Sequence, residues 1–364
     1  MNKSYTIHSF RKCKPVVISA IFIIALISSL YAESIQCVWS GIDKIVAVGD
    51  IHGDYENFVT ILKSTGLIDE KLHWTGGKTH LVQTGDIMDR GPDAKKVYDL
   101  IRKLEKEAAA AGGKVHMLIG NHEELNITGI AFDYVGYVTV EQFISFLPAN
   151  YRDKKEKDFR KKIEKNLPQG TNSVANLNGL IRYYWQEIIK TSKGARTRYT
   201  DNYYEKYGKW ILTHNAVIKI NDIVFVHGGI SEKYSTKILS TINNDLRNEL
   251  KDLYRKQKFS DPITYPPKIV YDQMGPLWYR ELATNNGENM EEEVDKILQN
   301  LDAKYMVMGH TVLTGPAFSP EAMSRYDGKI WIIDTGISKA YGGSLSALII
   351  ENGNFSVWGL KYEK

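Results

Sequence analysis

Short apolar runs, each followed at once by a glycine and a polar residue, recur in the first third of the chain. Residues 44–48 and 80–84 end at Gly-Asp, and residues 115–119 end at Gly-Asn. Between the second and third runs, residues 93–111 are typical of a helix that stops at a Gly-Gly pair. Strands that alternate with a helix predict an α/β fold with a largely parallel sheet, whose functional residues lie at the carboxyl ends of the strands.

Apolar runs rich in β-branched residues also mark the second half of the chain. Three of them are predicted to continue the same sheet: residues 223–226, 305–308 and 329–333. Residues 346–350 and 355–358 flank the turn sequence Glu-Asn-Gly, and they are predicted to pair as a terminal hairpin.

Residues 130–210 differ in character and are predicted to form a mostly helical cap, inserted over the crevice at the strand ends. They contain a charged helical segment at 152–165, a break rich in glycine and asparagine at 169–179, and a tyrosine-rich stretch. We expect the charged segment to be a solvated helix face. The tyrosines could stack on an aromatic substrate, but we favour packing of the cap onto its domain. They are Tyr183, Tyr184, Tyr199, Tyr203, Tyr204 and Tyr207.

The first 32 residues have the layout of a secretory signal peptide. Four basic residues precede the apolar run 16–30, which is followed by small residues. About fifteen apolar residues are short for a membrane-spanning helix. We therefore divide the chain into a signal peptide (1–32) and one folded domain (33–364), and expect a secreted, periplasmic or otherwise exported protein. The alternative is an uncleaved leader that anchors the protein in a membrane.

Composition and charge exclude several classes of protein. With 364 residues, 43% apolar and 25% charged, the chain has an ordinary globular composition. Without the leader, 43 of the 47 basic residues remain against 43 acidic residues, so the domain is near neutral and no nucleic-acid surface is expected. Cys37 is the one cysteine outside the leader, which rules out an internal disulfide and a cysteine zinc site in the cleaved form. The sequence makes no prediction about oligomeric state.

Five motifs place polar residues directly after predicted strands. They are GDIHG (49–53), GDIMDRG (85–91), GNHE (120–123), HGG (227–229) and GHT (309–311). A lone Gly-Asp turn is more often a helix cap than a site, but five such motifs in one order favour a site. Asp50 and His52 can reach one ion, and the carboxylate of Asp86 can bridge two ions. The remaining candidate ligands of the second ion are Asn121, His227 and His310.

Carboxylate, amide and imidazole ligands together suit transition ions better than calcium or magnesium. We expect two divalent ions, with manganese as the first choice and iron or zinc as alternatives. Two ions roughly 3.5–4 Å apart can clamp a phosphoryl oxygen and lower the pKa of a shared water for in-line attack. The predicted chemistry is therefore hydrolysis of a phosphate ester by a metal-bridging hydroxide.

The same motifs supply groups for proton transfer and phosphate binding. His122 follows a ligand directly, and an imidazole oriented by Asp89 can protonate the departing oxygen as a general acid. Arg90 adjoins Asp89 and could donate two hydrogen bonds to phosphate oxygens. Arg280 is a candidate for a second phosphate contact, with a structural ion pair as its alternative. Asn121 is a further candidate for binding the substrate phosphate.

The five motifs resemble those of the metal-dependent phosphoprotein phosphatases of the calcineurin-like metallophosphoesterase superfamily, over residues 45 to about 340. The resemblance implies a four-layer β-sandwich flanked by helices, with residues 33–364 as the catalytic domain. It also implies that Asp50, His52 and Asp86 bind one metal ion, and that His122 with Asp89 is the proton donor. By the same resemblance the second ion is bound by Asp86, Asn121, His227 and His310.

Two stretches, GNHEELNITG and GPLWYR, are similar to the Shewanella-like branch of these phosphatases. The Ser-Ala-Pro-Asn-Tyr stretch of the eukaryotic enzymes is absent, and residues 334–338 (DTGIS) stand in its place. Members of this branch include phosphotyrosine-directed enzymes. Lys339 and Tyr341 follow this loop and could border the pocket, whereas we expect His214 to be a packed or surface histidine.

We expect a phosphoprotein phosphatase that favours phosphotyrosine, with phosphoserine and phosphothreonine as possible substrates. The nearest alternative keeps the metals but hydrolyses dinucleoside polyphosphates, as bis(5'-nucleosyl)-tetraphosphatases do. Export of the chain argues against this alternative, because such nucleotides are mainly cytosolic. A third reading is a non-catalytic protein that grips a phosphorylated partner, but such proteins usually lose a ligand or the acid, and none is missing here.

Overall fold

The computed structural model describes residues 35–166, 174–259, 268–313 and 319–360. The signal peptide expected at 1–32 lies outside these residues. Within the described ranges, no helix is both long and apolar enough to span a bilayer.

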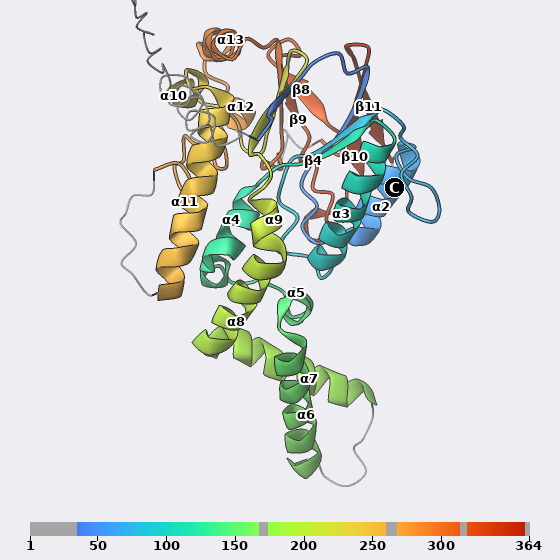
Figure 1. Cartoon of the computed structure of the whole chain (residues 1–364), viewed down its shortest axis with the longest axis vertical. Helices are drawn as coiled ribbons and strands as arrows, with labels where there is room; N and C mark the ends of the chain where they lie inside the picture. Colours follow the sequence, from blue (N-terminus) through green and yellow to red (C-terminus); the bar gives the residue numbers. More distant parts are fainter. Residues whose placement is uncertain (1–34, 167–173, 260–267, 314–318, 361–364) are drawn as a thin grey trace, which may run out of the picture. The chain divides into compact units, whose positions relative to one another are not determined.

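Two mixed β-sheets form the centre of the fold (Figure 1). The strand order is β11-β10-β2-β3-β4 in one sheet and β1-β5-β6-β7-β9-β8 in the other. The strands of the first sheet are β2 (Lys44–Val48), β3 (His80–Gln83), β4 (Lys114–Met117), β10 (Ser346–Glu351) and β11 (Asn354–Gly359). Those of the second are β1 (Val38–Trp39), β5 (Val217–Ile220), β6 (Ile223–Val226), β7 (Tyr305–Met308), β8 (Met323–Arg325) and β9 (Ile330–Ile332).

Helices cover both sheets, because α3 packs against β4 of the first sheet and α11 against β5 of the second. The predicted β-sandwich flanked by helices is therefore confirmed. The helices outside the cap are α2 (Tyr55–Ser64), α3 (Ala94–Ala110), α4 (Asn121–Thr128), α10 (Glu232–Ser235), α11 (Leu239–Phe259), α12 (Glu281–Thr284) and α13 (Met290–Asn300), with short 3-10 turns at Ile130–Asp133 and Lys339–Tyr341.

The prediction that the later strands continue the first sheet is wrong. Strands β6, β7 and β9 pair with one another in parallel and belong to the second sheet. The edge of β2 is instead taken by β10, which pairs with it antiparallel and brings the terminal hairpin into the first sheet. Apolar runs specify strands but not their partners, so the sequence could not assign these strands to a sheet.

Parallel pairing brings the carboxyl ends of strands from both sheets to one place. In the first sheet β2, β3 and β4 run parallel, and their side chains are almost completely buried, as expected for strands covered on both faces. In the second sheet β6, β7 and β9 also run parallel. Each of these six strands is followed within a few residues by a polar side chain of the site described below.

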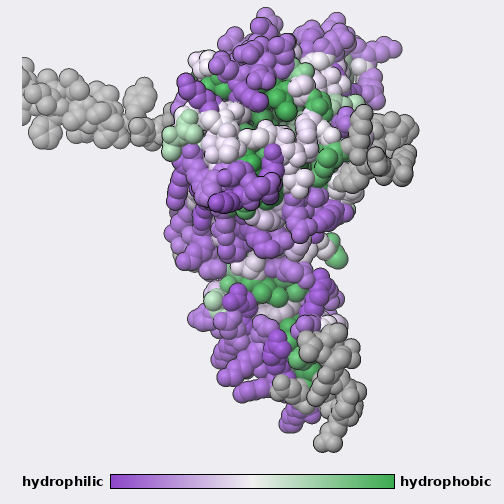
Figure 2. All heavy atoms as spheres, turned by 90° about the vertical axis from the view of Figure 1, so that its right-hand side faces the viewer, coloured by the Kyte–Doolittle hydropathy of each residue, from purple (hydrophilic) through white to green (hydrophobic). Residues whose placement is uncertain are grey.

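The predicted cap is a set of helices that extends from the sandwich at the bottom of Figure 1. Most charged side chains of α6 are exposed, as expected for a solvated helix, and hydrophilic residues dominate this part of the molecule in Figure 2. The cap helices are α5 (Val140–Phe146), α6 (Ala149–Asn166), α7 (Val174–Thr191), α8 (Lys193–Tyr203) and α9 (Lys209–Ile211), with a π-helical turn at Tyr204–Gly208 between the last two.

Two expectations for the cap have different outcomes. The break expected at 169–179 is wrong from residue 174 onward, where α7 begins; residues 167–173 lie outside the description. The packing role of the tyrosines is confirmed for Tyr199 and Tyr203, which are fully buried. Tyr204 likewise stacks on Tyr254 of α11, with ring centroids 3.5 Å apart.

A buried histidine pair joins β3 to β4. His116 Nε2 lies 3.0 Å from His80 Nδ1, and both residues are 5% exposed. Burial, aided by the charge of Lys114, lowers the pKa of His80 to about 4, and burial also lowers the pKa of His116 well below its usual value. The folded state therefore disfavours protonation of this pair.

We expect this pair to make the free energy of unfolding depend on pH. At low pH the unfolded chain binds protons that the folded chain rejects, so the pair's contribution is fully present above about pH 6.5 and is lost as the pH falls towards 4. Each unit by which the pKa in the folded state lies below that in the unfolded state contributes about 1.4 kcal/mol to the free energy of unfolding. Denaturant unfolding of the wild type and of His116→Asn between pH 7 and pH 5 measures the effect. If the free energy of unfolding changes equally with pH in the two proteins, the histidine pair is not the source of the pH dependence.

Candidate active site

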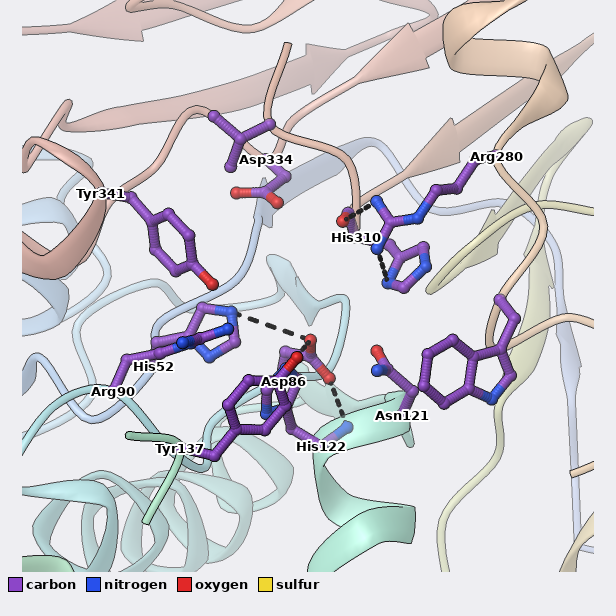
Figure 3. A pocket seen from close by; sticks show the side chains of 12 residues that line it. His52, Asp86, Arg90, Asn121, His122, Tyr137, Arg280, His310, Asp334 and Tyr341 are labelled. Atoms are coloured by element: carbon purple, nitrogen blue, oxygen red, sulfur yellow. Dashed lines mark hydrogen bonds and ion pairs between the residues drawn. The ribbon is translucent and has the colours of Figure 1, made fainter. Parts of the chain in front are cut away.

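The predicted ligands converge at the carboxyl ends of strands from both sheets (Figure 3). Asp50 and His52 follow β2, and Asp86 follows β3. Each of the six predicted ligands is at most 5% exposed. Four of them, His52, Asp86, Asn121 and His310, line a cavity of about 440 Å³. Its lining residues are His52, Asp86, Arg90, Asn121, His122, Tyr137, Trp278, Arg280, His310, Val312, Asp334 and Tyr341.

Asp86 lies at the centre of this arrangement. Two groups of side chains have ligand atoms within 4.8 Å of one another, and Asp86 belongs to both. One group is His52, Asp86 and His122, and the other is Asp86, His227 and His310. A carboxylate shared by two groups is the arrangement expected for the bridging ligand of two ions.

Two histidines have a fixed orientation towards Asp86. His52 Nδ1 donates to the carbonyl of Met88, and His227 Nδ1 donates to the carbonyl of Thr84, each at 2.9 Å. A carbonyl can only accept, so each Nδ1 carries the proton and each Nε2 is left to bind a metal ion. His52 Nε2 is 3.8 Å from one oxygen of Asp86, and His227 Nε2 is 3.3 Å from the other. These bonds are the outer-sphere support that metal-binding imidazoles require.

The charge of the site also favours cations. Burial raises the pKa of Asp50 well above its usual value, and the neighbouring carboxylates of Asp334 and Asp86 raise it further. Burial raises the pKa of Asp334 to about 6. Burial alone would raise the pKa of Asp86 too, but the histidines around it, His227 first, hold it well below its usual value. Three buried carboxylates, with imidazole nitrogens near that of Asp86, fit a pair of divalent ions.

Asp50 differs from its predicted role in one respect. Both of its oxygens accept from the backbone N–H of His310 at 3.1 Å, and it is not in either of the two groups, where His122 stands instead. Asn121 does join the second group, because its Oδ1 lies 2.9 Å from His227 Nε2. Within the described part of the chain, the buried Nε2 of His310 has no hydrogen-bond partner, which leaves that nitrogen available for a ligand.

The proposed proton donor is paired as expected. His122 Nδ1 donates to Asp89 Oδ2 at 2.7 Å, and Asp89 is fully buried. Burial lowers the pKa of His122, but the carboxylates of Asp86 and Asp89 outweigh burial and raise it above its usual value. His122 Nε2 lies 3.8 Å from Asp86 and faces the cavity (Figure 3). A protonated imidazole at the cavity wall can supply a proton to a leaving group.

Positive φ values recur at non-glycine residues of these loops. Non-glycine residues rarely adopt positive φ, and such conformations persist only where the surroundings impose them. Asp89 and Arg90 have consecutive φ values of 69° and 68°, and the N–H of Arg90 donates to the carbonyl of Tyr137 at 2.9 Å. His52, Asp86 and His310 also have positive φ. The fold therefore holds the side chains of the site in conformations that isolated loops would avoid.

The two arginines border the cavity in different ways. The guanidinium carbon of Arg90 lies 3.9 Å from the ring centre of Tyr137 and 5.6 Å from that of Tyr341. Arg280 Nη1 donates to the carbonyl of His310 at 2.7 Å and to Thr311 Oγ1 at 3.1 Å. Arg280 therefore supports the loop that carries a ligand. Within the described ranges its hydrogen bonds go to His310 and Thr311 rather than to a carboxylate, so the ion-pair alternative has no support there.

Comparisons with known proteins agree with this geometry. The sequence model of the calcineurin-like phosphoesterases matches residues 43–313. The chain belongs to the calcineurin-like phosphoesterase family. It is therefore a hydrolase of phosphoesters, and the dinuclear metal centre of this family fits the two groups around Asp86.

Three known proteins are similar to this phosphoesterase in sequence or in structure. It is 29% identical to Shewanella-like protein phosphatase 1 of Plasmodium berghei over 314 residues, which are 85% of this chain and 71% of that protein. The crystal structure of a cold-active protein-tyrosine phosphatase from a psychrophilic Shewanella species matches with a TM-score of 0.63 and 26% identity, covering 91% of this chain and 85% of that one. A symmetrical bis(5'-nucleosyl)-tetraphosphatase of Cronobacter sakazakii is 33% identical over 76 residues, 21% of this chain and 22% of that protein.

Several functional residues of this phosphoesterase were not singled out from the sequence. The carboxylate of Glu123 accepts from the N–H groups of Gly120, Asp86 and Ile87, so it ties two ligand loops together. Glu123 stands at the third position after the N-cap Gly120 of α4, where a glutamate can accept from the N-cap N–H. Tyr137, which lines the cavity, had no such signal, because no motif surrounds it that marks a site. Trp278 also lines the cavity; it lies in the GPLWYR stretch, but only Arg280 of that stretch was named as a site candidate.

Three residues left open by the sequence are now placed. Tyr341 lines the cavity, whereas Lys339 pairs with Glu56 on the surface. His214 is a packed histidine, as expected, because its Nε2 bonds to Glu105 at 2.6 Å.

Proposed function

We propose that the protein is a dinuclear-metal phosphoprotein phosphatase that favours phosphotyrosine. The observation that carries this proposal is the position of Asp86, which joins two ligand groups, next to a cavity with the His122–Asp89 pair on its wall. Membership of the family supports hydrolysis of phosphoesters. The proposal that the substrate is a protein rests on the Shewanella-like relatives.

Each side chain has a definite task in this proposal. We assign one metal site to Asp50, His52 and Asp86, and the other to Asp86, Asn121, His227 and His310. Two divalent ions, manganese first, supply positive charge at the phosphoryl oxygens and lower the pKa of the attacking water. His122, oriented by Asp89, donates a proton to the leaving oxygen. Arg90, Arg280 and Asn121 bind the phosphate.

The cavity walls support a preference for phosphotyrosine. Tyr137 and Tyr341 line the cavity together with Arg90 (Figure 3). Trp278 is a further lining residue. An aromatic leaving group can stack on such walls, and aromatic pairs are worth roughly 0.5–1.5 kcal/mol beyond the area they bury. A phosphoserine side chain is too short and too polar to gain this contact. The Shewanella protein of similar fold is a protein-tyrosine phosphatase.

Replacing Tyr341 by leucine tests this preference. We expect the ratio of kcat/KM for a phosphotyrosine peptide over that for the matched phosphoserine peptide to fall about three- to tenfold, as loss of one aromatic contact implies. Effects on the metal site change both rates and cancel in the ratio. Tyr134→Ala is the matched control, because Tyr134 stacks on Tyr137 at 4.8 Å but does not line the cavity. A ratio unchanged in Tyr341→Leu contradicts the aromatic contact.

A direct assay separates this function from hydrolysis of dinucleoside polyphosphates. We expect the manganese-loaded protein to turn over the phosphotyrosine peptide with a higher kcat/KM than diadenosine tetraphosphate. The sequence match to a tetraphosphatase covers 21% of the chain, against 85% for the phosphatase of Plasmodium berghei. Faster hydrolysis of the dinucleotide would replace the proposed function by the alternative.

We also propose that the protein acts outside the cytoplasm. The basic residues and apolar run within 1–32 support this location, and the membrane-anchored form is the alternative. Fractionation of producing cells, with the N-terminal residue of the recovered protein determined, tests it. Recovery of the full-length chain from the cytosol would refute export.

A further inference from the structure

The carboxylate of Asp89 is held on more sides than its pairing with His122 requires. Asp89 Oδ2 accepts from His122 Nδ1 and also from Asn126 Nδ2 at 2.9 Å. Gln142 contacts Asp89 twice: its Nε2 donates to Asp89 Oδ1, and its Oε1 accepts from the backbone N–H of Asp89, each at 2.8 Å. The side chain and the backbone of Asp89 are thus fixed by one glutamine amide.

Tyr199 closes these contacts into a ring. Its hydroxyl accepts from Gln142 Nε2 at 2.8 Å and donates to Asn126 Oδ1 at 2.7 Å. Asn126 Nδ2 also donates to the carbonyl of His122 at 2.9 Å. Asp89, Asn126, Gln142 and Tyr199 are all fully buried.

The donors and acceptors of the ring fit only one way. A carboxylate only accepts, so the amide NH₂ of Asn126 and that of Gln142 must both face Asp89. The oxygen of Asn126 is then the acceptor for the Tyr199 hydroxyl, and the oxygen of Gln142 receives the N–H of Asp89. Every member is satisfied, and a fully satisfied buried network fixes a single arrangement.

The ring crosses from the catalytic core into the cap. Asp89 lies on the loop after β3 and Asn126 on α4, whereas Gln142 belongs to α5 and Tyr199 to α8. Asp89 itself has a positive φ, a conformation that needs support from its surroundings. Gln142 and Tyr199 of the cap provide this support.

We propose that Gln142, Tyr199 and Asn126 are positioning residues for the His122–Asp89 pair, so that the cap is part of the proton-donating machinery. This inference rests on the proposed function, in which His122 protonates the leaving group. None of the three residues lines the cavity, and each acts through Asp89. Losing one of them lets Asp89 turn, and His122 then loses its orientation towards the leaving oxygen.

The basicity of the leaving group makes this role measurable. A phenol like that of tyrosine has a pKa near 10 and needs a proton as it departs, whereas p-nitrophenolate is far less basic and leaves unaided. A misplaced acid therefore slows hydrolysis of phenyl phosphate and spares hydrolysis of p-nitrophenyl phosphate. A purely structural defect slows both substrates equally.

The test uses Gln142→Met and Tyr199→Phe in the full chain loaded with manganese. We expect kcat for phenyl phosphate to fall about ten- to hundredfold in Gln142→Met and less in Tyr199→Phe, because general acids contribute roughly 10²–10⁴-fold in total. The rate with p-nitrophenyl phosphate should change less than about threefold. Tyr207→Phe is the matched control: it also removes a cap hydroxyl, but one that donates to Asp99 of α3 at 2.7 Å.

A double-mutant cycle shows whether the residues act through the acid. In a His122→Asn background, Tyr199→Phe and Gln142→Met should cause no further loss, because residues that act as one unit are not additive. The inference would be overturned if the losses of the single variants multiply in the double mutants, or if each variant slows both esters equally. Tyr199→Phe deletes a single oxygen, so it remains informative if Gln142→Met does not fold.

A readout without turnover separates this inference from the proposed function. The Nδ1 proton of a histidine that is hydrogen-bonded to a buried carboxylate gives a downfield NMR signal. The signal is assigned to His122 if it disappears in His122→Asn. We expect that signal to shift or broaden in Gln142→Met and Tyr199→Phe but not in Tyr207→Phe. An unchanged signal refutes the positioning role, whereas a wild-type protein that hydrolyses neither ester refutes the phosphatase proposal alone.

Discussion

Asp86→Asn is expected to remove nearly all phosphatase activity, with kcat/KM lower by on the order of 10³-fold or more. Asp86 belongs to both ligand groups, and its oxygens face His52, His122 and His227. Two-ion sites contribute several kcal/mol of transition-state stabilisation, and each 1.36 kcal/mol is tenfold in rate. Losing the bridging charge therefore affects both ions at once.

Asparagine is the suitable replacement because the space around Asp86 is tight. A Cβ added at Gly120 would contact both the side chain and the backbone N–H of Asp86. An isosteric amide avoids rearranging this contact, so the variant is expected to fold. Its circular dichroism spectrum checks that expectation.

Metal content distinguishes the cause of the loss. We expect about two manganese ions per chain in the wild type, from the two ligand groups, and fewer in Asp86→Asn, measured by elemental analysis after gel filtration. Asp295→Asn is the matched control, because Asp295 is an exposed acid that pairs with Lys329. Full metal content together with wild-type turnover in Asp86→Asn would show that Asp86 does not bridge the ions.

The second large effect is expected from His122→Asn, which should lower kcat for a phosphotyrosine peptide by about 10²- to 10⁴-fold. The imidazole faces the cavity, and Asp89 holds it by a 2.7 Å hydrogen bond. Phosphotyrosine leaves as a basic phenolate, so it depends on this proton. The loss should be much smaller for p-nitrophenyl phosphate, whose leaving group needs no acid.

His122 also lies 3.8 Å from Asp86 and belongs to one ligand group, so a metal role must be separated from an acid role. Metal content close to that of the wild type, with a loss that grows with the basicity of the leaving group, supports the acid. Loss of an ion, with equal loss on all esters, would instead make His122 a ligand. Asp89→Asn should follow the acid pattern, because Asp89 holds His122 and is in neither ligand group.

Much of the site could be predicted because its residues follow strands directly. Asp50, Asp86, His227 and His310 each stand within two residues of an apolar run, and parallel strands bring such positions to one edge. The spacing between an apolar run and its polar residue involves neighbouring positions only. It is therefore visible in the sequence without knowing which strands pair. The position of His122 was predictable for the same reason, since it adjoins Asn121 in one motif.

The second layer of the site could not be predicted in this way. Gln142 and Tyr199 stand in the cap, 53 and 110 positions beyond Asp89, without a glycine motif or a strand end beside them. Tyr199 was expected only to pack, which it does, but its hydroxyl also completes the ring around Asp89. A hydrogen bond between distant helices depends on how those helices dock, and apolar periodicity carries no such information.

The sequence by itself determined most of the strands, though not β1, β5 and β8, together with the order of the motifs, the helical character of the cap and the candidate residues for binding metal and moving a proton. These properties depend on backbone preferences and on side-chain chemistry within a few neighbouring residues. Only the tertiary structure decided which strands belong to which of the two sheets, that Asp50 accepts from the backbone of His310, and that cap residues reach Asp89. Strand pairing and helix docking join residues far apart in the chain, and the free energy that selects them comes from burial and hydrogen bonding in the assembled fold.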